Sequence, residues 1–340
     1  MDKRLDEIEW TGTSDNTIKR IMSEGIETVE QLLQYTTKEL AEKIHSQEST
    51  VDKVIEQAIR EYGLAFETGA EVLEAQKQEW VLSTGSVEFD RILGGGIRSR
   101  GVTELIGEYS SGKSQACFTA AVIGTQVPPN EEGEPPKVVL IDNEHTFSPH
   151  RIIEIARTRG YNPDMVLNRL LVKEANTSAH QEKLIDVLDY VMKKNYVVLI
   201  IIDGMISHLR NEYLGRGSLS ERQQKLNKML GKLLSISVSH NIPLLVTNQV
   251  QAKVDGRGFG DPNQPAGGHI MAHANKCRVR LWKGREHTKL VSVIDSSFLP
   301  EEKTRIAVSK AGIVDEDGTF PDYVIGTKID FTLEEPSDES

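Results

Sequence analysis

The sequence predicts an α/β protein in which a mostly parallel sheet with crossover helices carries antiparallel C-terminal strands and follows a small all-α domain. Three observations support this fold class. From residue 85 onward, short β-rich apolar runs alternate with long amphipathic segments, which is typical of a parallel sheet with crossover helices. A glycine-rich segment at 107–112 separates the first of these runs from a helical segment. The first 63 residues show helical spacing instead.

Length and composition limit the number of domains and the class of protein. A chain of 340 residues suits one domain of about 200–250 residues with a smaller companion. Its 38% hydrophobic residues can fill a core, which excludes a wholly disordered protein. The longest apolar run, at 197–202, is too short to span a membrane, and the first residues lack the apolar stretch of a secretion signal. We therefore expect no membrane association and a cytoplasmic location. Cys117 and Cys277 have no metal-binding or redox spacing.

The N-terminal part has the pattern of short helices. Helical spacing occurs at 16–24, 37–45 and 50–62. The charged segment that follows predicts a partly helical linker, and the acidic end of the chain predicts a frayed tail. The predicted division is a helical domain at 1–63, a linker at 64–82, a core at 83–331 and a tail at 332–340.

The core is predicted from two groups of apolar runs. Buried parallel strands are expected at 102–106, 138–141, 197–202 and 243–246. Later runs are separated by short turns, which favour antiparallel strands that extend the same sheet. These later strands are expected at 276–282, 290–295 and 305–309. The segment 128–136, rich in Pro, Glu and Gly, predicts a surface loop.

Residues 107–114 read GEYSSGKS and fit the phosphate-loop pattern GxxxxGK[ST], directly after a strand and at the start of a helix. Backbone amides in such a loop bind phosphate oxygens. Lys113 adds a cation, and the Ser114 hydroxyl can ligate Mg²⁺. The alternative is a simple glycine-rich turn. A simple turn does not need a strand before it and a helix after it, whereas a phosphate loop does. The predicted nucleotide contacts are Gly107, Glu108, Tyr109, Ser110, Ser111, Gly112, Lys113, Ser114 and Gln115.

Polar residues follow three of the predicted parallel strands. Asp203 ends the strand at 197–202, where a carboxylate can hold Mg²⁺; the alternative is a residue that caps the next turn. Glu144 follows the strand at 138–141 and can polarise an attacking water, or it is a surface acid of a loop. Gln249 follows the strand at 243–246, and its amide can contact a γ-phosphate. These strand ends are consistent with one crevice.

Residues 210–260 carry eight basic and three acidic side chains, although the whole chain has a net charge of −11. A local basic patch of this kind can bind nucleic acid in an acidic protein. The solvated face of a helix followed by a loop explains the same charges, so charge alone does not decide.

Several segments together resemble the RadA recombinase family, the archaeal counterparts of the eukaryotic RecA-type strand-exchange proteins. The resemblance covers residues 60–330 and is weaker before them. It implies a RecA-type P-loop ATPase core after a degenerate helix-hairpin-helix domain. The matching segments are STGS at 83–86, FDRILGGGI at 89–97, the phosphate loop, EHTF at 144–147, NEYLGRGSLSERQQKLNK at 211–228, TNQV at 247–250 and GGH at 267–269.

The resemblance implies roles for individual residues. Glu144 is the implied catalytic glutamate, acting with Lys113 and Gln249, and Arg151 is implied to contact the adenine. Asp295, with Pro300, is implied to cap the ATP of a neighbouring subunit. Phe66 and Gly69 are implied to form the polymerisation contact. With the basic patch, the implied DNA contacts are Arg210, Tyr213, Arg216, Arg222, Lys253, Arg257, Gly267, Gly268 and His269.

The implied cofactors are ATP and Mg²⁺, and the implied partners are single-stranded and double-stranded DNA. The resemblance also implies self-association into rings or helical filaments and a nucleoid-associated location. Single-strand-binding proteins and mediator paralogues are further expected partners. ATP held between subunits would make filament geometry depend on the nucleotide state.

The chain departs from the family pattern at several positions. Gly69 occupies the place of an alanine in the polymerisation motif, and the lost methyl costs about 0.8 kcal/mol per interface. The candidate hairpin at 11–14 has one glycine, and the candidate hairpin at 45–50 has no glycine. Residues 1–63 are net acidic. We therefore expect a mainly structural or regulatory N-terminal domain. Near the nucleotide, the substituted positions are Ser110, Asn143, His145, Ser148 and Gly204.

Three functions compete. The leading hypothesis is an ATP-dependent DNA recombinase that acts as a filament and catalyses strand exchange in repair and recombination. The rival is a mediator paralogue that binds ATP and DNA but assists another recombinase, as Gly69 and the degenerate hairpins would allow. A RecA-type ATPase that acts on protein is the third, and the segment at 211–228 argues against it.

Overall fold

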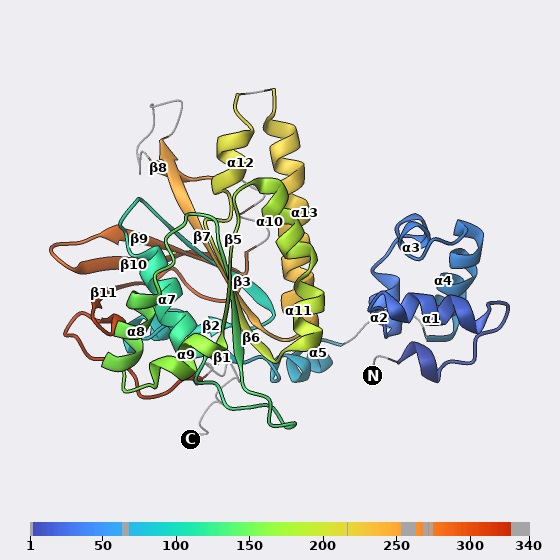
Figure 1. The fold of residues 1–340 in the computed structure, drawn as a ribbon, viewed down its shortest axis with the longest axis horizontal. Helices are drawn as coiled ribbons and strands as arrows, with labels where there is room; N and C mark the ends of the chain where they lie inside the picture. Colours follow the sequence, from blue (N-terminus) through green and yellow to red (C-terminus); the bar gives the residue numbers. More distant parts are fainter. Residues whose placement is uncertain are drawn as a thin grey trace, which may run out of the picture. The chain divides into compact units, whose positions relative to one another are not determined.

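The computed structural model describes residues 3–62, 68–215, 217–252, 263–267, 271 and 275–327. The chain forms two compact units, Met1–Lys77 and Gln78–Ser340, which are coloured along the sequence in Figure 1. Each unit is described by itself. The division into helical domain, linker, core and tail remains a prediction, because the tail and residues 63–67 of the linker lie outside the described residues.

The first unit is helical. Its elements are η1 (Leu5–Glu7), α1 (Asp15–Ser23), α2 (Val29–Leu33), α3 (Thr37–Lys43), α4 (Glu48–Tyr62) and α5 (Gly69–Gln76). Side chains cap the starts of three helices: Ser14 accepts from the Thr17 amide, and Thr28 and Thr36 form capping boxes. Apolar residues from each of the first four helices form the core of this unit. The short helix α2 was not predicted, because five residues are too few to show helical spacing.

The second unit contains the predicted sheet. Its strands are β3 (Gly101–Gly107), β4 (Lys137–Asp142), β5 (Leu170–Glu174), β6 (Val197–Asp203), β7 (Pro243–Ala252), β8 (Asn263–Pro265), β9 (Cys277–Lys283), β10 (Thr288–Ser296), β11 (Lys303–Ser309) and β12 (Gly312–Asp315). The order is β12-β11-β10-β9-β3-β7-β6-β4-β5, and β8 pairs with β7. All neighbours from β9 to β5 are parallel, and those from β9 to β12 are antiparallel. The predicted fold class is therefore confirmed.

Two details differ from the prediction. β9 joins β3 in parallel and is antiparallel only to β10, because the chain crosses over between β7 and β9 rather than turning back. β5 and β12 were not predicted: β5 is a half-exposed edge strand without a continuous apolar run, and β12 has four residues. A small separate sheet pairs β1 (Val81–Leu82) with β2 (Ile97–Arg98).

Helices cover both faces of the sheet (Figure 1). Their bounds are α6 (Val87–Ile92), α7 (Lys113–Gly124), α8 (Pro149–Thr158), α9 (Pro163–Arg169), α10 (Ser178–Asp186), α11 (Leu188–Lys194), α12 (Ser207–Glu212) and α13 (Leu219–Ser239). Along β6, Leu199 and Ile201 pack with α7 and α8, while Ile200 and Ile202 pack with α12 and α13. Burial on both faces explains why β6 is apolar without interruption. Within the described residues, no helix is long and apolar enough to cross a membrane.

Candidate active site

The register of the sheet brings the predicted residues to one edge. Gly107, at the end of β3, lies opposite Gln249 of β7. Asp142, at the end of β4, lies opposite Asp203 of β6. Because these strands are parallel, their carboxyl ends form a single edge, where ligands of open α/β sheets bind.

The phosphate loop has the backbone that anion binding requires. Ser110 and Gly112 have φ values of 61° and 105°, and left-handed residues within a tight turn direct amides into a concave nest. A side chain at Gly107 would collide with Ser111 and with the Leu281 carbonyl, so the loop fits closely against β9. The Ser111 hydroxyl is buried without a protein partner. An orphaned donor at this place fits a phosphate oxygen.

Lys113 begins α7 and is almost fully buried. Its Nζ donates to the carbonyl oxygens of Gly107 and Glu108, at 2.9 Å each. Burial lowers the pKa of Lys113, whereas the carboxylates of Glu144 and Asp203 act in the opposite direction. The ammonium thus lies inside the loop, next to the acids that the sequence predicted.

Asp203 is the buried acid of the site. It accepts hydrogen bonds from Thr247 Oγ1 at 2.6 Å, from Thr146 Oγ1 at 3.2 Å and from the Ser114 hydroxyl. Burial raises the pKa of Asp203, and the bonds from Thr247 and Ser114 oppose this shift. The carboxylate and the Ser114 hydroxyl are hard oxygen ligands that fit Mg²⁺. Among the described residues, no three His, Cys, Asp or Glu side chains are grouped so that they could hold a metal ion.

Glu144 is held in place by one side chain from strand β7 and one from helix α12. Its Oε1 accepts from Gln249 Nε2 at 2.8 Å and from Ser207 Oγ at 3.0 Å. Its backbone amide donates to Asp142 Oδ1 at 3.0 Å. The half-buried carboxylate faces the edge where Lys113 and Asp203 lie. A solvated surface acid would lack these partners.

Arg151 lies beside the start of α7. Its Nε donates to Gln115 Oε1 at 2.8 Å, and its guanidinium also donates to the carbonyl of Ser309, the last residue of β11. The implied contact of Arg151 with the adenine remains a prediction. Asp295 lies on β10 and pairs with Arg278 at 3.8 Å, and Pro300 lies between β10 and β11. Their described contacts are not with the phosphate loop, and their implied action on a neighbouring subunit remains a prediction.

The described DNA-contact candidates lie beyond the same edge. Arg210 is on α12, Tyr213 caps its end and Arg222 is in the first turn of α13. The Lys225 ammonium lies 5.3 Å from the centroid of the Tyr213 ring. β7 continues past the sheet to pair with β8, and Gly267 follows with φ of 90°. Figure 1 shows α12 and β8 at the same end of this unit.

Several predicted residues cannot be placed. Outside the described residues lie Phe66, Arg216, Lys253, Arg257, Gly268 and His269. Gly69 begins α5 in the first unit. Among the other predicted nucleotide contacts, Tyr109 is largely exposed.

Sequence reasoning missed three hydroxyl groups of the site. Thr247 Oγ1 accepts from the Gly204 amide at 2.7 Å while it donates to Asp203. Thr146 reaches Asp203, and Ser207 reaches Glu144. Thr247 and Thr146 lie within segments that match the family, so the sequence could have identified them as site residues. Ser207 lies outside all of these segments, and nothing in the sequence pointed to it.

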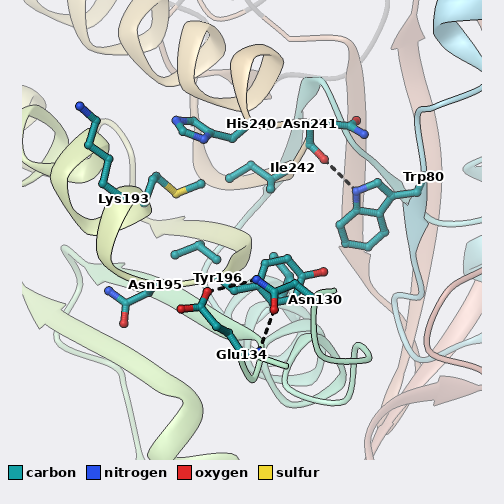
Figure 2. A pocket seen from close by; sticks show the side chains of 12 residues that line it. Trp80, Asn130, Glu134, Lys193, Asn195, Tyr196, His240, Asn241 and Ile242 are labelled. Carbon is teal, nitrogen blue, oxygen red and sulfur yellow. Dashed lines mark hydrogen bonds between the residues drawn. The ribbon is translucent and has the colours of Figure 1, made fainter. Parts of the chain in front are cut away.

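A cavity of about 390 Å³ lies at the opposite edge of the sheet, near the amino ends of β6 and β7 (Figure 2). Several of its polar side chains form hydrogen bonds within the protein. Trp80 Nε1 donates to the Asn241 carbonyl at 2.8 Å, and Asn130 Nδ2 donates to Glu134 Oε2 at 3.1 Å. The cavity is therefore separate from the candidate active site, and these contacts are structural.

Comparison with known families agrees with this geometry. The family model described as Rad51 matches residues 75–316, a span that includes the phosphate loop, Glu144, Asp203, Gln249 and the candidate DNA contacts after β6 and β7. Members of this family are DNA-dependent ATPases with a RecA-type recombinase domain. The match covers more than half of the chain, and the chain belongs to the Rad51 family.

Proposed function

We propose that the protein is an ATP-dependent DNA recombinase of the RadA type, which polymerises on single-stranded DNA and catalyses homologous pairing and strand exchange. One observation carries the proposal. The Glu144 carboxylate, beside Lys113 and Asp203, accepts hydrogen bonds from Ser207 and Gln249. Ser207 begins the helix that leads to the first candidate DNA loop, at 210–222, and Gln249 lies just before the second, at 251–269. The hydrolytic centre would therefore be connected to both loops through these two residues.

Nucleotide binding follows from the phosphate loop. The amides of the loop and the start of α7 would bind the phosphate oxygens, and the Ser111 hydroxyl would gain the partner that the protein does not supply. Lys113 would exchange its carbonyl partners for the β- and γ-phosphates. Mg²⁺, held by Ser114 and Asp203, would supply positive charge at the phosphates.

Hydrolysis requires a proton acceptor near the terminal phosphate. Glu144 would accept the proton of the attacking water at its carboxylate. Gln249 would leave Glu144 and donate its amide hydrogens to the γ-phosphate. Because Gln249 precedes the second candidate loop, loss of that phosphate would return it to Glu144 and shift the loop.

DNA binding would use backbone phosphates. Arg210 and Arg222, with the basic residues outside the described part, would neutralise phosphate charge without reading the sequence. Base pairing then supplies the specificity that a strand-exchange protein needs. We further propose assembly into rings or filaments through Phe66 and Gly69, ATP capping by Asp295 of a neighbour, and a nucleoid-associated location.

The mediator paralogue is the second candidate, favoured by Gly69 and by the glycine-poor candidate hairpins at 11–14 and 45–50. Such a protein would bind ATP and DNA but would assemble weakly alone. The third candidate, an ATPase that acts on protein, would hydrolyse ATP at a rate indifferent to DNA.

The experiment is ATP hydrolysis with and without single-stranded DNA, with Glu144→Gln as the matched variant. We expect DNA to stimulate turnover of the unchanged protein. The variant should bind ATP but turn over at least about a hundredfold more slowly, because general base catalysis supplies that order of acceleration. Turnover unaffected by DNA would exclude the recombinase, and normal turnover by the variant would exclude Glu144 as the proton acceptor.

A further inference from the structure

We propose that Ser207 is a positioning residue for the catalytic carboxylate of Glu144, and that the glycine at position 204 makes this contact possible. The inference rests on the proposed function, because it concerns ATP turnover. It concerns a contact between the end of β6 and α12 that the phosphate-loop and strand-end motifs do not contain.

The Ser207 hydroxyl is committed to Glu144. Ser207 is the first residue of α12, and Ile206 precedes it as a cap without a side-chain hydrogen bond. The Ser207 amide donates to the Gly204 carbonyl at 3.1 Å, which fixes the turn between β6 and the helix. The Oγ then donates to Glu144 Oε1 at 3.0 Å, across a sequence separation of 63 residues.

Gly204 provides the space for this bond. A Cβ at this position would lie 2.7 Å from Glu144 Cγ and 2.7 Å from Ser207 Oγ. Gly204 also has φ of 84°, a conformation that side chains disfavour. A larger residue would therefore displace the Glu144 or Ser207 side chain, or change the turn. Gly204, Ser207 and Glu144 form one packing unit.

The Ser207 hydrogen bond would be most important for Glu144 after Gln249 has moved away from it. Both donate to the same Glu144 oxygen, and Gln249 would move to the γ-phosphate during turnover. Ser207 then remains, among the described contacts of the Glu144 side chain, as the donor that orients the carboxylate toward the water. The same helix carries Arg210 and ends at Glu212, with Tyr213 as its C-cap. If DNA binding moves this helix, the movement would therefore also displace the Ser207 hydroxyl from Glu144.

The test compares Ser207→Ala and Ser207→Thr in the full-length protein. A hydrogen bond to an ionised group justifies an expected loss of about tenfold in kcat for Ser207→Ala. KM for ATP should not change, because the phosphate loop is intact. Ser207→Thr keeps the hydroxyl and should recover most of the rate. Ser239→Ala, at the exposed end of α13, is the matched control and should match the unchanged protein.

Gly204→Ala gives an independent variant. We expect it to lower kcat as Ser207→Ala does, and the double variant should lose no more than the larger single loss. Effects that share one contact are non-additive, whereas separate folding defects would add. Thermal unfolding and affinity for a non-hydrolysable ATP analogue should remain close to those of the unchanged protein in Ser207→Ala.

The outcomes separate this inference from the proposed function. Full DNA-stimulated turnover by Ser207→Ala, while the unchanged protein is active, would overturn the role of Ser207 alone. Equal losses in Ser207→Thr and Ser207→Ala would overturn it as well, because the hydroxyl would then be irrelevant. No turnover in the unchanged protein, with or without DNA, would overturn the proposed function and the role of Ser207 together.

Discussion

Replacing Arg278 by methionine removes the cation that faces a buried carboxylate in the core sheet. Glu104, on β3, has no exposed surface, and Arg278 lies opposite it on β9. Arg278 Nε donates to Glu104 Oε2 at 2.8 Å, and Asn248 and Asn275 each donate to the carboxylate at 2.7 Å. Asn248 also donates to the Ala266 carbonyl, so the network connects β7 with Ala266, which lies in the second candidate loop.

The expected loss in the free energy of unfolding follows from the buried charge of Glu104. Removing one partner of a buried ion pair costs about 3–5 kcal/mol, because the other charge is left uncompensated. The two asparagine donors remain, which places the expected loss for Arg278→Met near the lower end. Against a typical unfolding free energy of about 5–15 kcal/mol, this is a large fraction.

The loss should depend on pH. Burial raises the pKa of Glu104 above its ordinary value, and Arg278 is the first of the groups that oppose this shift. Without Arg278, the folded variant holds a proton that the unfolded chain releases. Its stability therefore falls as pH rises above the ordinary value of 4.5. The difference between the two proteins should be larger at pH 8 than at pH 5.5.

The assay is urea unfolding of both proteins without nucleotide, with Arg285→Met as a control at an exposed arginine. Glu104→Gln combined with Arg278→Met should recover part of the loss, because no buried charge remains. A loss of less than about 1 kcal/mol in the free energy of unfolding at pH 8, with an unchanged urea dependence, would show that Arg278 does not compensate the Glu104 charge. A buried carboxylate without its cation must cost more than that.

Three other predictions address assembly, packing and DNA. Gly69→Ala should strengthen self-association by about 1 kcal/mol per interface, because an added Cβ meets nothing within 4 Å in the chain; unchanged sedimentation would contradict this. Asn143→Thr should raise the free energy of unfolding by about 1 kcal/mol, since both buried amide atoms lack protein partners; equal or lower stability in urea would count against it. Arg222→Ala should keep ATP affinity but reduce the salt dependence of DNA binding by about one phosphate contact; an unchanged salt slope would exclude that contact.

The sequence predicts those parts of the fold that depend on local patterns, such as apolar runs and the polar residues that follow them. The run at 197–202 is apolar because both faces of β6 are covered. Glu144 after β4, Asp203 at the end of β6 and Gln249 within β7 mark the ligand-binding edge. β5 was missed because a half-exposed edge strand has no continuous apolar run. The orientation of β9 depends on the path of residues 253–276, which local spacing does not reveal.

The active site was predictable only in part, for a similar reason. Lys113, Ser114, Asp203, Glu144 and Gln249 follow strands in recognisable patterns, and the sheet register brings them together. The role of Gly204 depends on side chains that approach it from β4 and α12 in space. The substitution was visible in the sequence, but the space that it opens for Ser207 appears only in the fold.

The central claim is most directly tested by strand exchange with the purified protein alone. A single-stranded oligonucleotide and a homologous duplex are incubated with the protein, ATP and Mg²⁺, with Lys113→Ala as the inactive control. We predict that the unchanged protein transfers the strand and that Lys113→Ala does not. ATP hydrolysis by the unchanged protein without any transferred strand would contradict the recombinase and favour the mediator paralogue.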